Sequence, residues 1–74
     1  MDAAEFLRKV RKYAKDRGIP YALDTSQGRG SHAMVYLGGR RTVVPMHAGR
    51  EIGKGLLHGM LKDLGLTVRD LTGR

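Results

Sequence analysis

The chain has 74 residues, and its 14 lysines and arginines against seven aspartates and glutamates give a formal net charge of +7 at pH 7. This length fits one domain over residues 1–74 that buries only about 60% of the surface of the unfolded chain. The absence of cysteine excludes disulfides and thiolate metal sites, and no apolar run reaches the roughly 18 residues of a membrane span. We therefore expect a small cytoplasmic protein, not associated with a membrane, whose charge attracts a polyanion such as nucleic acid.

The first predicted element is an amphipathic helix over residues 2–17. Asp2 is placed to cap it, and Glu5 three residues later resembles a capping box. Gly18 fits a left-handed C-terminal cap, and Pro20 prevents continuation. The apolar positions that share one face are Phe6, Leu7, Val10 and Ala14, and the cations on the remaining surface are Arg8, Lys9, Arg11, Lys12 and Lys15.

Three strands are predicted next. Residues 20–24 form a short strand, residues 25–31 have a loop composition, and residues 32–37 and 40–45 form a hairpin around Gly38-Gly39. Two glycines suit the positive φ values of a tight turn. This turn places Leu37 opposite Arg40, and counting back places His32 opposite Pro45.

The hairpin register sorts the side chains onto two faces. The more apolar face, which we expect to pack on the helices, carries Ala33, Val35, Leu37, Thr42 and Val44. The opposite face carries His32, Met34, Tyr36, Arg41 and Val43. His32 is therefore predicted to lie on the open face of the sheet.

A second helix is predicted from Lys54 to Leu64 and ends at Gly65. Leu57, Met60, Leu61 and Leu64 are spaced for burial, and Gly55 and Gly59 suggest close packing against a neighbour. A third, short helix begins near Thr67. The order predicts an α+β, two-layer fold with helices on one face of a three-stranded antiparallel sheet.

The strongest candidate for a catalytic or phosphate-binding site is the glycine-rich basic run of residues 28–32, in which His32 is the first residue of a predicted strand. Imidazole exchanges a proton near neutral pH, and the Arg29 guanidinium can hold a phosphate bidentately. Ser31 is better explained as shaping the loop than as a nucleophile. A lone histidine is more often an ordinary surface residue, so the case depends on its neighbours.

Two further positions are candidates for phosphate binding. His47 lies in the linker before the second helix, and Lys54 lies where the free N–H groups and dipole of a helix start favour anions. The linker does not match a P-loop, and a plain glycine-rich turn explains it equally well. No histidine spacing indicates a metal site.

Motifs spread over most of the chain together resemble the HicA toxin family. They are Gly30-Ser31-His32, the run from Gly39 to His47, the run from Glu51 to Leu57, Met60-Leu61-Lys62 and Gly65-Leu66. Each is short, but their order and spacing are specific. The resemblance implies a double-stranded-RNA-binding-like α-β-β-β-α fold and the activity of a toxin–antitoxin ribonuclease that cleaves mRNA.

The resemblance also implies roles and partners. His32 occupies the position of the family's essential histidine, and we expect it to act as a general base without metal or cofactor. Candidates for RNA or phosphate binding are Arg29, Ser31, Arg41, His47 and Lys54. The expected partners are mRNA and a HicB-like antitoxin, and we expect oligomers to form only through the antitoxin.

Two other functions compete with this interpretation. A non-catalytic RNA-binding module of the same fold would use the same basic surface without cleaving the RNA. A structural protein bound permanently to an acidic partner would explain the charge without binding RNA.

Overall fold

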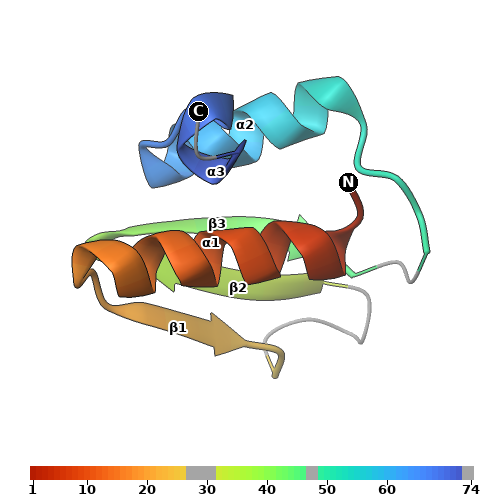
Figure 1. Cartoon of the computed structure of the whole chain (residues 1–74). Coiled ribbons are helices and arrows are strands. Elements are labelled where there is room, and N and C mark those ends of the chain that lie inside the picture. Colours follow the sequence, from red (N-terminus) through yellow and green to blue (C-terminus); the bar gives the residue numbers. More distant parts are fainter. Residues whose placement is uncertain (27–31, 47–48, 73–74) are drawn as a thin grey trace.

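A computed structural model describes residues 1–26, 32–46 and 49–72. The elements follow in the order α1 (Ala3–Arg17), β1 (Tyr21–Asp24), β2 (His32–Leu37), β3 (Arg40–Pro45), α2 (Lys54–Leu64) and α3 (Val68–Thr72). The strands form one antiparallel sheet in the order β1-β2-β3. Figure 1 shows the helices gathered on one side of this sheet. The predicted α+β architecture is confirmed.

Both ends of α1 are fixed by the residues that the sequence indicated. The Asp2 carboxylate accepts a hydrogen bond of 2.9 Å from the Glu5 backbone N–H, which satisfies one of the donors left open at a helix start. Glu5 itself lies 3.4 Å from Lys9 Nζ. Gly18 adopts φ 66°, the left-handed conformation predicted for the C-terminal cap.

The hairpin has the predicted strands and the predicted register. Leu37 opposes Arg40, and His32 opposes Pro45. Only Gly38 of the two turn glycines has positive φ, 60°, as in a type II′ turn. The Gly38 N–H also donates to the Pro20 carbonyl at 2.9 Å, which ties the turn to the start of β1.

The core lies between the helices and the predicted apolar face of the sheet. Its largest fully buried side chains are Phe6, Val10, Val35, Val44 and Met60. Thr42 is a buried polar residue on the same face, and its hydroxyl donates to Asp63 Oδ2 at 2.8 Å. This hydrogen bond joins β3 to α2 and satisfies a group that would otherwise be costly to bury.

The two glycines inside α2 do not mark a close contact with a neighbouring element. A Cβ added at Gly55 or Gly59 would meet nothing within 4 Å, so the prediction of close packing at these two positions was wrong. Gly65 is the position where a side chain does not fit. Its φ is 72°, and a Cβ there would lie 2.9 Å from Arg40 Nε. The glycine that caps α2 therefore also leaves room for the Arg40 side chain.

The short α3 is closed by a reciprocal cap. The Thr67 backbone N–H donates to Asp70 Oδ2 at 2.8 Å, and the Asp70 N–H donates to Thr67 Oγ1 at 3.2 Å. This capping box holds Leu71 in the core beside α1. None of the helices in the described part of the chain has the length and apolarity to cross a membrane.

Candidate functional site

His32 is the first residue of β2, and its side chain is exposed. Burial alternates along this strand, with Ala33, Val35 and Leu37 buried against the helices. Successive side chains of a strand point to opposite faces, so His32 lies on the face that the helices leave open. The orientation predicted from the hairpin register is confirmed.

Asp24 is a neighbour of His32 that the sequence did not reveal. It opposes Met34 across β1 and β2, and Met34 lies two residues from His32 on the same face, so Asp24 and His32 are diagonal neighbours about 7–8 Å apart. The Asp24 carboxylate accepts hydrogen bonds from the Ser26 N–H at 2.8 Å and the Ser26 hydroxyl at 2.6 Å. The end of β1 therefore brings a positioned carboxylate close to the histidine.

Arg41 is exposed on the same open face as His32 but at a distance from it. It opposes Tyr36, four residues along β2 from His32, which is about 13 Å at the rise of a strand. Met34 and Tyr36 are half-buried between the two positions, and Val43 is 45% exposed. His32 and Arg41 are therefore too far apart to contact one phosphate group.

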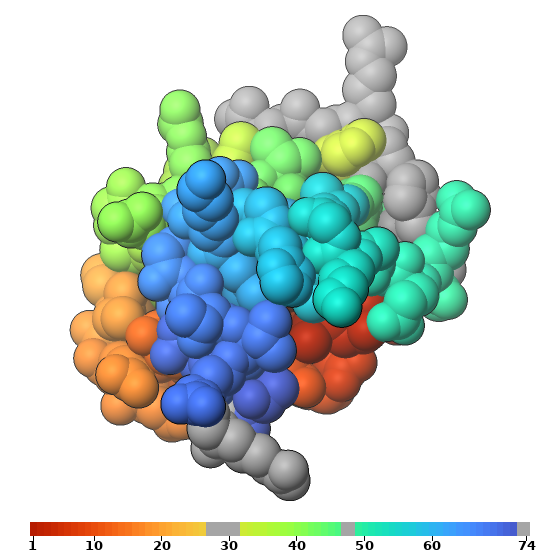
Figure 2. Space-filling view, turned by 90° about the horizontal axis from the view of Figure 1, so that it is seen from above, coloured from red at the N-terminus to blue at the C-terminus, as the bar shows by residue number. Residues whose placement is uncertain are grey.

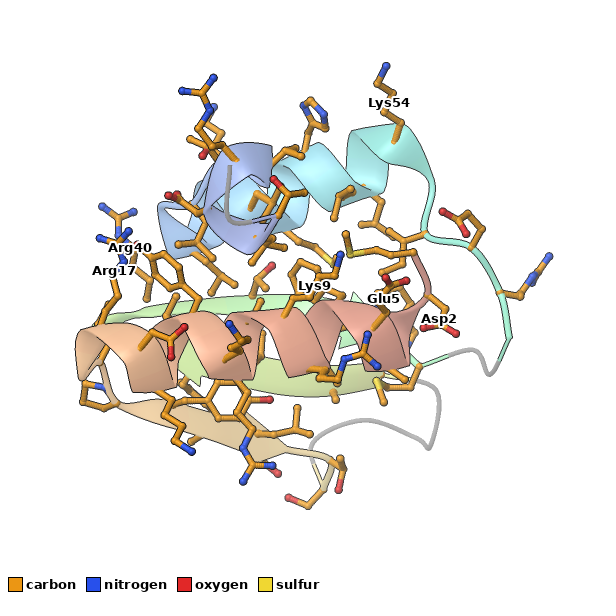
Figure 3. The ribbon with its side chains drawn as sticks, in the orientation of Figure 1. Asp2, Glu5, Lys9, Arg17, Arg40 and Lys54 are labelled. Carbon is orange, nitrogen blue, oxygen red and sulfur yellow. The ribbon has the colours of Figure 1, made fainter. Side chains whose placement is uncertain are left out.

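Lys54 is the first residue of α2, and its exposed side chain points away from the sheet (Figure 3). The fold does not bring it to the face that carries His32. The N-terminal cap before it is Gly53, which contributes no side-chain hydrogen bond.

The linker before α2 supplies a cation that the sequence analysis did not single out. A hollow of about 220 Å³ at the end of β3 is lined by Pro45 and Arg50, together with Glu51, Ile52, Gly53 and Leu56. Pro45 is the cross-strand partner of His32, so Arg50 lies at the same end of the sheet as the histidine. The linker is fixed there because Glu51 pairs with the N-terminal ammonium group and the Ile52 N–H donates to the Met1 carbonyl at 2.9 Å.

Three candidate residues, Arg29, Ser31 and His47, lie outside the described residues. Within the described ranges, no group of three histidine, aspartate or glutamate side chains is arranged to hold a metal ion. The chemistry that these ranges do bring together is an exposed imidazole with a carboxylate diagonally across the sheet.

Known proteins resemble this chain over most of its length. Residues 21–66, from the start of β1 to just beyond α2, match the family model described as HicA toxin of bacterial toxin–antitoxin. The chain is also 39% identical over 58 residues to a protein of Pseudomonas fluorescens (strain Pf0-1) named "Probable mRNA interferase HicA". That alignment covers 78% of this chain and 90% of the relative. No solved structure shows a match.

Proposed function

This chain belongs to the HicA toxin family, and from that premise we propose that it is an endoribonuclease that cleaves mRNA in the cytoplasm, without a metal ion, with His32 as the catalytic residue. The name of the Pseudomonas relative supports the reaction class. The observation that carries the assignment to His32 is its exposed position at the start of β2, on the face that the helices leave open.

The proposed reaction begins with proton transfer to the imidazole. His32 takes the proton of a ribose 2′-OH, and the oxygen attacks the adjacent phosphorus. The bond from phosphorus to the 5′ oxygen breaks, and that oxygen takes a proton from water and leaves as a 5′-OH, while the His32 imidazolium returns its proton to the solvent. The other product ends in a 2′,3′-cyclic phosphate, so atoms and charge balance without a redox partner. Among the described cations Arg50 lies at the same end of the sheet, where a guanidinium can stabilise the charge that develops on the phosphate.

The chemistry is tested with the purified protein and single-stranded RNA in excess EDTA. We expect cleavage to continue at the rate seen without chelator, because the base is an imidazole, and we expect products with a cyclic phosphate and a free 5′-OH. Mass spectrometry of the fragments identifies both ends. Loss of cleavage in EDTA with recovery on adding Mg²⁺ would exclude the metal-free mechanism. RNA binding without any cleavage would favour the non-catalytic RNA-binding module.

We also propose that a HicB-like antitoxin silences the enzyme by covering the open face of the sheet. Val43 is exposed there beside the half-buried Met34 and Tyr36, and exposed apolar groups of this kind form the cores of protein interfaces. The family description, a toxin of a toxin–antitoxin pair, supports the existence of such a partner.

Changing Val43 to lysine tests the antitoxin surface. We expect Val43→Lys to keep RNase activity and to weaken antitoxin binding by at least about tenfold, because a charge is buried without a partner at the interface. Calorimetric titration with the purified antitoxin measures the affinity. Leu56→Lys is the matched control, since Leu56 is 47% exposed on α2. If Leu56→Lys weakens the complex and Val43→Lys does not, the antitoxin covers the helical side instead.

A further inference from the structure

Among the residues that the structure describes, positive charge is concentrated away from the face that carries His32. On the open face of the sheet, the described side chains include the cation Arg41 and the carboxylate of Asp24 besides the histidine. Helix α1, on the other side, holds six of the chain's 14 lysines and arginines. Phosphate contacts by lysine and arginine supply most of the affinity for a nucleic acid. Among the described residues, the open face therefore carries too little positive charge to hold a long RNA by itself.

The charge on α1 lines a groove between α1 and α3. Two adjoining hollows of about 620 Å³ and 250 Å³ share four lining residues, which are Lys9, Lys12, Leu71 and Thr72. Arg8 lines one end and Arg17 the other, and nine steps of 1.5 Å along the helix place them about 14 Å apart. In Figure 2 the blue residues of α3 lie against the red and orange of α1. Figure 3 shows Lys9 rising from α1 beside Glu5, whose Oε2 lies 3.4 Å from Lys9 Nζ.

The side chains of this groove suit an anion. Four cations, Arg8, Lys9, Lys12 and Arg17, face two carboxylates, those of Asp16 and Asp70. One carboxylate is already engaged, because Asp70 caps α3. The other lies 3.4 Å from Lys12 in a pair whose side chains are 78% and 60% exposed. Such an exposed pair is weak and yields readily to a phosphate.

Arg17 is held in place for binding. Its guanidinium carbon lies 4.8 Å from the centre of the Tyr13 ring, a stacking distance. Stacking occupies the flat face of the guanidinium and leaves its N–H edge to meet an acceptor, so less side-chain freedom is lost when a phosphate binds.

The groove suits a phosphate backbone better than a protein surface. The core of a protein interface is depleted of charge and enriched in exposed apolar and aromatic groups. The large exposed hydrophobic residues in the described part of the chain are Leu23, Val43, Leu56 and Val68, and none of them lines the groove. Leu71 lines it but is only 8% exposed.

We infer that the α1–α3 groove is a second RNA-binding site, which holds the phosphate backbone of the substrate away from the cleavage centre at His32. This inference rests on the proposed ribonuclease function. Binding and cleavage therefore take place on different surfaces. RNA is cleaved at His32 on the open face of the sheet, and its phosphate backbone is bound in the groove. RNA too short to reach both sites gains nothing from the groove.

The test compares two double variants with the same loss of charge. Arg8→Ala with Lys12→Ala removes two exposed cations that line the groove. Lys15→Ala with Lys62→Ala removes two exposed cations that do not line it. Alanine favours helix at all four positions, so both variants should fold. The probe is a 2′-O-methyl RNA of about 12 nucleotides, within the range of single-strand site sizes, in which the attacking hydroxyl is blocked.

We expect the salt dependence of RNA binding to weaken in the groove variant and to stay unchanged in the control variant. Each lost single-strand phosphate contact removes about 0.7 from the slope of log affinity against log salt, so two contacts remove about 1.4. Between 50 and 200 mM salt this is about a sevenfold smaller drop in affinity than for the wild type. KM for long RNA should rise, while cleavage of a dinucleotide should not change.

Three outcomes would overturn the inference. Equal slopes for the two variants would mean that the charge acts diffusely. An unchanged RNA slope with weaker antitoxin binding would make the groove a protein docking site. Slower cleavage of a dinucleotide would place these residues in the catalytic centre. Failure of the proposed function looks different, because the wild type would then cleave no RNA while the groove variant still lost salt dependence.

Discussion

Replacing His32 with alanine is expected to abolish RNA cleavage while leaving the fold intact. A positioned general base contributes about 10²–10⁴-fold to the rate, and His32 is the exposed imidazole of the open sheet face. The side chain is outside the core, so its truncation removes no buried contact among the apolar residues. Initial rates on a fluorescent RNA in EDTA measure the loss, and thermal unfolding followed by circular dichroism measures the fold.

The matched control for this variant is His58→Ala. His58 is also exposed, but it lies on α2, so its loss should leave the rate within about twofold of the wild type, as for a surface change of about 0.5 kcal/mol or less. Retained cleavage by His32→Ala would remove the catalytic assignment. Equal loss in both variants would point to general damage to the surface that binds RNA. Binding of uncleavable RNA should persist in His32→Ala, because the inferred groove is untouched.

The sequence predicted the hairpin to the residue because a two-residue turn leaves no freedom in the pairing. Once Leu37 faces Arg40, every other partner follows, and the face that carries His32 follows with them. The ends of α1 were predictable for a similar reason, since Asp2 and Gly18 satisfy backbone groups within a few residues of themselves. Turns and helix caps can be predicted from the sequence because their hydrogen-bond partners lie within a few residues of one another.

What the sequence did not reveal depends on which elements meet. Asp24 lies diagonally across from His32 only because β1 pairs with β2 in one register, and the length of the loop between these strands does not determine that register. Arg50 reaches the same end of the sheet only because the linker is fastened to the N-terminus. The packing of α3 on α1 creates the cationic groove, whereas the sequence showed only a charged helix face. The prediction of close packing at Gly55 and Gly59 failed because no other element packs within 4 Å of these two positions.

Replacing Phe6 with alanine is expected to unfold much of the protein and to remove cleavage by a route unlike that of His32. Phe6 is fully buried in the cluster where α1 meets the sheet and α2. Truncating a buried phenylalanine costs about 3–5 kcal/mol, and a 74-residue chain has a total stability of only about 4–11 kcal/mol. Urea denaturation followed by circular dichroism measures the change in midpoint.

The control for Phe6→Ala is Leu56→Ala, because Leu56 is 47% exposed on α2 and its truncation should shift stability by no more than about 0.5 kcal/mol. Equal shifts in midpoint would show that the core at α1 is not the source of stability. The two inactive variants separate stability from chemistry. His32→Ala should keep the wild-type midpoint with no cleavage, and the folded fraction of Phe6→Ala should cleave at the wild-type rate. A ligand that binds only the folded state, such as uncleavable RNA, should therefore raise the folded fraction of Phe6→Ala, whereas no such ligand should return cleavage to His32→Ala, which is already folded.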